Sequence, residues 1–165
     1  MQKHLYFVCP TDHIETVINS TFQEENYYWT TLGNSVSFTR DTIREMYALI
    51  VTKNITEITF VLSDDNKIVK DALQKQQFSE IRGLDNFYDK ISHQRQFATL
   101  LWQTDDPRFP VISRYLLAKI QDLQLSMDSE FSSHVKIGAK IYNRNEQIFK
   151  KIYAPLFHLE SFNLN

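Results

Sequence analysis

Hydrophobic residues in the first half of the chain alternate between two patterns. Continuous apolar runs at 5–8 and 58–62 are typical of parallel strands buried on both faces, and the aromatic run at 27–32 predicts a further strand. A set of apolar residues at helical spacing follows each run. The first set is Ile14, Val17, Ile18 and Phe22, the second is Ile43, Met46, Tyr47, Ile50 and Val51, and the third is Ile68, Val69, Ala72 and Leu73. Three strands therefore alternate with three helices, and we expect Asn54 to end the second helix.

The second half of the chain begins with two longer helical patterns. The first runs from Leu84 to Trp102, and the second covers about 111–125. Pro107 and Pro110 lie between them and break the helical pattern. Strict alternation at 135–142 then predicts a strand, and a turn at 143–146 leads to a returning strand at 148–153. The order β-α-β-α-β-α-α-α-β-β predicts an α/β protein. We expect a mainly parallel sheet of about four strands, flanked by helices, with an antiparallel edge hairpin strand.

Composition narrows the class of protein. The 165 residues carry a net charge of −2, which gives no electrostatic reason to expect a nucleic-acid partner. A single cysteine excludes an internal disulfide and suits a reducing compartment. We find no secretory signal and no apolar run long enough for a membrane span, so we expect a cytoplasmic protein without a membrane partner. No linker or repeat divides the chain, and residues 1–165 are expected to form one domain.

Polar residues follow the first and third strand patterns directly. In open α/β sheets ligands gather at the carboxyl ends of the strands, so these segments are where chemistry is expected. Glycine is scarce, with three in the chain, and no phosphate-binding glycine loop is present. The candidate pocket consists of Cys9, Thr11, Asp12, His13, Thr30, Ser63, Asp65 and Asn66.

These residues allow a structural and a chemical interpretation. Structurally, Cys9 is a small core residue, Thr11 or Asp12 caps the first helix, and Asp64-Asp65 caps the third. Chemically, Cys9, His13 and Asp65 offer the thiolate, imidazole and carboxylate that zinc accepts, with Asp12 as a further ligand or a base. Cys9 beside a helix N-terminus could also be a reactive thiol without metal.

The order of elements and a few local motifs resemble the β-class carbonic anhydrases. In that family the first strand ends in C-x-D-x-R, a later strand in R-N-A-G-N, the next in G-H-x-x-C-G, and a terminal strand carries v-x-G-x-x-Y-d. Here Cys9 ends the first strand and 30–34 reads Thr-Thr-Leu-Gly-Asn. Residues 42–59 have the spacing that leads to the G-H-x-x-C site, and 137–143 reads Ile-Gly-Ala-Lys-Ile-Tyr-Asn. The resemblance covers most of residues 4–153.

The zinc ligands that the resemblance implies are incomplete. The family binds zinc through two cysteines and one histidine, with water at the fourth position. Of these three ligands only Cys9 is present, because Ser63 takes the histidine position and Asn66 the position of the second cysteine. Neither side chain is a good zinc ligand.

The charged pair of the family motif is also missing. Thr11 and His13 stand at the Asp and Arg positions, and a one-residue slip places Asp12 at the Asp position with no arginine after it. Thr30 replaces the arginine of the second motif. Hydration of carbon dioxide needs a hydroxide that free water, with a pKa of about 15.7, does not supply at neutral pH.

We therefore expect a non-catalytic relative that acts as a binding or interaction protein, with no cofactor. The alternative is a metal-dependent lyase or hydrolase with a rearranged zinc site around Cys9 and His13. A thiol enzyme that uses Cys9 ranks third. The resemblance also implies a homodimer, whereas the sequence does not identify a small-molecule or protein partner.

Overall fold

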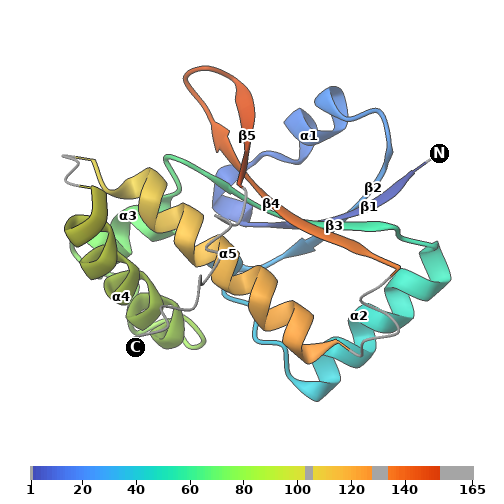
Figure 1. Ribbon diagram of the computed structural model, residues 1–165, viewed down its shortest axis with the longest axis horizontal. Coiled ribbons are helices and arrows are strands. Elements are labelled where there is room, and N and C mark those ends of the chain that lie inside the picture. Colours follow the sequence, from blue (N-terminus) through green and yellow to red (C-terminus); the bar gives the residue numbers. More distant parts are fainter. Residues whose placement is uncertain (1, 103–105, 128–133, 153–165) are drawn as a thin grey trace, which may run out of the picture.

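A five-stranded sheet forms the centre of the molecule (Figure 1). The computed structural model describes residues 2–102, 106–127 and 134–152, and of residues 98–102 the backbone alone. The strand order is β2-β1-β3-β4-β5; the first four strands are parallel, and β5 pairs antiparallel with β4 at one edge. The strands are β1 (Lys3–Val8), β2 (Glu25–Thr30), β3 (Glu57–Ser63), β4 (Lys136–Asn143) and β5 (Ile148–Ile152). This confirms the predicted fold class; Tyr153, the last residue of the predicted returning strand, lies outside the described residues.

The helices occur in the predicted order. They are α1 (Glu15–Thr21), α2 (Arg40–Lys53), α3 (Lys67–Leu73), α4 (Asp85–Trp102) and α5 (Arg108–Ser126), with short 3-10 turns η1 (Pro10–Asp12) and η2 (Leu32–Asn34). Asn54 follows α2 in the left-handed conformation (φ 53°), which confirms the predicted helix end. Helix α5 begins three residues earlier than predicted, because Pro110 lies in its first turn, where proline is tolerated. In the described part of the chain no helix is long and apolar enough to cross a membrane.

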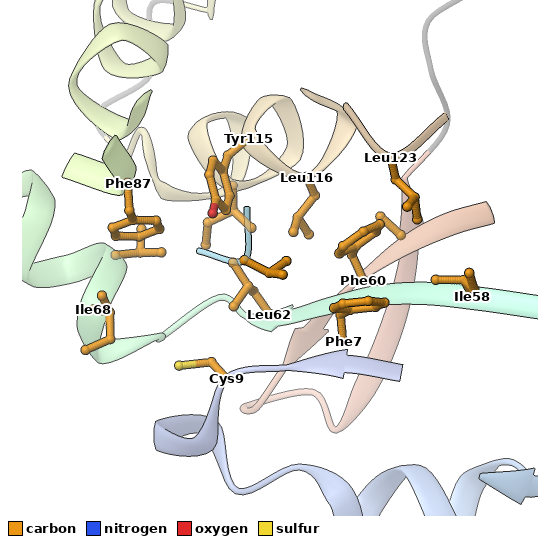
Figure 2. Packing of buried hydrophobic residues seen from close by; sticks show 14 of the residues in the cluster. Phe7, Cys9, Ile58, Phe60, Leu62, Ile68, Phe87, Tyr115, Leu116 and Leu123 are labelled. Carbon is orange, nitrogen blue, oxygen red and sulfur yellow. The ribbon is translucent and has the colours of Figure 1, made fainter. Parts of the chain in front are cut away.

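One face of the sheet carries the larger hydrophobic cluster. Alternate strand residues such as Phe7, Phe60 and Leu62 point to this face and pack against α5 residues such as Tyr115 and Leu116 (Figure 2). Helices α2, α3 and α4 also contribute buried residues to this cluster. The predicted apolar stripe of α2 is only partly buried: Met46 and Ile50 lie in the core, whereas Tyr47 and Val51 are exposed.

The opposite face has a thinner cover. Tyr6, Val8 and Val61 of the sheet pack there against Ile14 and Ile18, and α1 is the one described helix that contributes to this second cluster. A row of buried polar residues also lies on this face, at His4, Thr59 and Lys140. The His4 ring lies between two partners, with Nδ1 3.0 Å from Glu24 Oε2 and Nε2 2.7 Å from Thr59 Oγ1.

Candidate functional site

The carboxyl ends of β1 and β3 meet because the two strands are parallel neighbours. The turn η1 leaves β1 and directs the carboxylate of Asp12 toward the end of β3. Asp12 is 1% exposed, and its Oδ2 accepts a hydrogen bond of 2.9 Å from the backbone N–H of Ser63. Its Oδ1 accepts a second bond of 2.8 Å from the side-chain amide of Asn66. Three of the predicted site residues are thus joined by direct hydrogen bonds.

Asn66 connects this cluster to a helix. Its side-chain oxygen accepts a 2.9 Å hydrogen bond from the backbone N–H of Val69, so Asn66 is the N-cap of α3. The predicted caps were wrong: Asp64-Asp65 does not cap α3, and neither Thr11 nor Asp12 caps α1, which Ile14 precedes without a side-chain cap. His13 is the reason, because its left-handed conformation (φ 51°) separates η1 from α1 and leaves Asp12 facing the sheet.

Arg144 is a site residue that sequence reasoning missed. It follows β4, whose carboxyl end lies beside that of β3. Its guanidinium pairs with Asp65 (Nε to Oδ2, 3.0 Å) and donates a 2.8 Å hydrogen bond from Nη2 to the backbone carbonyl of Asp12. Asp65 also accepts a hydrogen bond from the hydroxyl of Ser63. The sequence signal for Arg144 was its place in the turn that follows the strand pattern of β4. That turn lies at the same edge of the sheet as the carboxyl ends of β1 and β3.

The two carboxylates of the cluster differ in their electrostatics. Burial raises the pKa of Asp12 to about 6, although the bonds from Ser63 and Asn66 oppose this shift. For Asp65 burial also acts to raise the pKa, but the hydrogen bonds from Ser63 and Arg144 outweigh it and hold the pKa below its ordinary value. Asp12 is therefore the carboxylate that changes its charge nearest to neutral pH.

Cys9 lies apart from these hydrogen bonds. Its side chain is fully buried and belongs to the large hydrophobic cluster (Figure 2). The sulfur accepts a 3.1 Å hydrogen bond from the backbone N–H of Gly33 and lies 3.1 Å from the hydroxyl of Thr11. Gly33 is in the left-handed region (φ +58°), and a Cβ at this position would lie 2.8 Å from Phe87 Cε2. The turn that holds the thiol therefore requires glycine.

The remaining predicted site residues do not complete a metal centre. The side chains of His13 and Thr30 are exposed. Within the described residues, no three His, Cys, Asp or Glu side chains form a group that could hold a metal ion. The donors at the strand ends are instead a serine, an asparagine and hydrogen-bonded carboxylates, so the residues present do not fit the zinc of the resembled family.

Comparisons with known proteins agree on the fold. No family model and no curated protein sequence matches the chain. The β-carbonic anhydrase CafD of the fungus Aspergillus fumigatus superposes with a TM-score of 0.74 at 14% identity, over 93% of this chain and 90% of that one. One of two tetrameric β-carbonic anhydrases of Sordaria macrospora gives a TM-score of 0.71 at 13% identity, over 93% and 81%. Coccomyxa β-carbonic anhydrase, in complex with acetazolamide, gives 0.70 at 14% identity, over 92% and 72%. The resemblance predicted from the sequence is confirmed at the level of structure: the chain has the fold of the β-carbonic anhydrases.

Proposed function

We propose that this chain is a non-catalytic protein with a β-carbonic-anhydrase-like fold that has lost the zinc site and acts by binding. The observation that supports this proposal is the hydrogen bonding of Asp12, Ser63 and Asn66 to one another. The resemblance places the family's histidine and second cysteine at Ser63 and Asn66. Both oxygens of the Asp12 carboxylate and the side-chain amide of Asn66 are engaged in this cluster, and Asn66 also caps α3. The positions of two family zinc ligands thus hold residues that take part in hydrogen bonds within the fold, which supports the loss of the zinc site.

Zinc binding tests this proposal. The protein is purified without a metal-affinity tag, offered zinc and dialysed, and its metal content is then measured. We expect far less than one zinc per chain, since a lone thiolate with an exposed imidazole is a weak site. Stoichiometric zinc that is lost in both Cys9→Ser and His13→Ala would overturn the proposal. That result would favour the metal-dependent lyase or hydrolase with Cys9, His13 and Asp65 as ligands.

Thiol reactivity tests the third possibility, an enzyme that uses Cys9. The sulfur is buried and lies in the hydrophobic cluster, so a water-soluble disulfide reagent reaches it only when the structure opens. We expect slow reaction of the folded protein near pH 7 and fast reaction in urea. Fast reaction of the folded protein would contradict the non-catalytic proposal and point to an activated thiol.

We also propose that the chain forms a homodimer. Among the described residues no strand pairs with the outer side of β2, and its aromatic side chains at Tyr27, Tyr28 and Trp29 are only half-buried. Open edges with apolar side chains favour association with another chain. Sedimentation velocity at several protein concentrations would show a dimer, and Tyr28→Lys should weaken it. A monomer at all concentrations would contradict this proposal.

A further inference from the structure

A cavity of about 490 Å³ lies between the loop 35–38 and helices α4 and α5, apart from the hydrogen-bonded cluster of Asp12, Ser63 and Asn66. The loop 35–38, the first two turns of α4 and the second half of α5 line it. None of its lining residues belongs to the cluster around Asp12, so a ligand in this cavity does not require zinc to bind at the strand ends. Its volume is in the range of cavities that hold small organic ligands.

The cavity contains a buried lysine. Lys119 of α5 is 4% exposed, and its ammonium donates a 2.6 Å hydrogen bond to the backbone carbonyl of Val36. The same nitrogen lies 5.6 Å from the centre of the Phe38 ring and 5.8 Å from that of Tyr115. An ammonium has three N–H donors, and among the described residues Val36 supplies its one hydrogen-bond acceptor. The other two donors of this buried charge have no hydrogen-bond acceptor among the described residues, and Lys119 lines the cavity.

The charges around Lys119 leave room for a negative partner. Asp122, one turn further along α5, pairs instead with Lys90 of α4 at 3.0 Å, where both side chains are partly exposed. Loop 35–38 adds only Ser35 and Ser37 hydroxyls and backbone groups. Burial, followed by the charge of Lys90, lowers the pKa of Lys119 to about 8, and Asp122 opposes this only partly. An anion beside the ammonium would offset the free-energy cost of burying this charge.

The lining favours one kind of anion. Two lysines and one aspartate give an excess of one positive charge, which matches a singly charged group. The described lining has no arginine and no glycine-rich turn, the features that favour a phosphate. Val36, Phe38 and Phe87 supply an apolar wall. We propose that this cavity binds a small organic monocarboxylate, with the carboxylate on the ammonium of Lys119 and the apolar body against Phe38 and Phe87.

Binding of benzoate to the full chain tests this proposal. The amide resonances of residues 35–38 in a ¹H–¹⁵N spectrum report the location, and their shifts give the affinity. We expect saturable binding with a Kd on the order of 1 mM, as is usual for so small a ligand. Lys119→Met, which keeps the length and volume of the side chain, should weaken binding at least about tenfold, as expected for loss of a buried charged partner. Lys136→Met, which changes an exposed lysine of β4, should leave the affinity unchanged.

Two further measurements keep the proposal open to refutation if Lys119→Met fails to fold. Benzamide, the neutral analogue, should not bind at the same concentrations. The affinity of the wild type for benzoate should fall as the pH rises through about 8, where Lys119 loses its proton. Equal affinity for benzamide, a flat pH profile, or tighter binding of inorganic phosphate than of benzoate would each overturn the proposal.

Discussion

The buried carboxylate of Asp12 should make the fold less stable as the pH rises toward neutrality. Its pKa of about 6 in the folded protein lies above the ordinary value of 3.8. The folded state therefore holds this proton over a pH range in which the unfolded state has released it. The contribution to stability is complete below pH 3.8 and is lost as the pH rises through 6. Asp12→Asn cannot ionise, so its stability should lack this component.

The size of the effect follows from the shift in the pKa of Asp12. The difference between about 6 and 3.8 corresponds to about 3 kcal/mol of unfolding free energy, most of it between pH 4 and pH 7. The variant also carries a constant penalty, since its new NH2 group must face one of the two donors that the carboxylate accepts from, the backbone N–H of Ser63 or the amide of Asn66. That penalty does not vary with pH, so the pH dependence isolates the ionisation of Asp12.

Urea unfolding of both proteins, followed by tryptophan fluorescence at several pH values from 4 to 7.5, measures the difference in stability. Titratable groups that do not interact with Asp12 contribute equally to both proteins and cancel. We expect the wild type to lose about 2 to 3 kcal/mol relative to Asp12→Asn across the range. A difference that stays constant, or one that changes in favour of the wild type, would refute the reasoning. It would mean that the bonds from Ser63 and Asn66 outweigh the cost of burying the charge.

Three further predictions follow from other contacts. Gly33→Ala should lower the unfolding free energy by about 2 to 4 kcal/mol, because residue 33 has a left-handed backbone and lies close to Phe87. Chemical unfolding measures this change, and an unchanged midpoint would contradict the prediction. Arg144→Gln should cost about 1 kcal/mol at low salt and less in 1 M NaCl, because its ion pair with Asp65 is partly exposed; a salt-independent loss would argue against an electrostatic cause. Because the pKa of Lys119 is lowered, the unfolding free energy of the wild type should rise by about 2 kcal/mol relative to Lys119→Met between pH 7 and pH 10, as the buried ammonium loses its proton. An equal pH dependence of stability in both proteins would contradict this prediction.

The architecture could be predicted because hydrophobic period and local turn chemistry determine it. The runs at 5–8 and 58–62 became the central strands β1 and β3, and Asn54 ended α2 in the left-handed conformation. These features depend on residues within a few positions of one another. The sequence also indicated correctly that polar residues after β1 and β3 would meet, because parallel strands bring their carboxyl ends to one edge.

The internal contacts of the candidate site could not be predicted in this way. Asp12 reads as a helix cap in the sequence, yet its partners Ser63 and Asn66 lie 51 and 54 residues away along the chain. Arg144 joins the cluster from 79 residues beyond Asp65. Only the register of the sheet brings these groups together, and a local pattern does not contain it.

Lys119 is a different case, since the sequence carried a signal that was not used. It lies four residues after Tyr115 and four before Leu123, both buried, and therefore on the apolar side of α5. A lysine within an apolar helical stripe either extends its amine to solvent or brings a charge into the core. The structure shows the second outcome.

The unequal cover of the sheet has a consequence for how the molecule opens. The larger cluster involves four helices, whereas α1, seven residues long, is the one described helix in the smaller cluster, and it begins without a side-chain cap. Sub-global unfolding starts where few apolar contacts are lost. The α1 layer is thus the part of the molecule that can detach while the rest keeps its hydrogen-exchange protection. A protease would then cleave the chain between β1 and β2. The rate of this cleavage would measure local opening of α1 and not the global unfolding free energy of the protein.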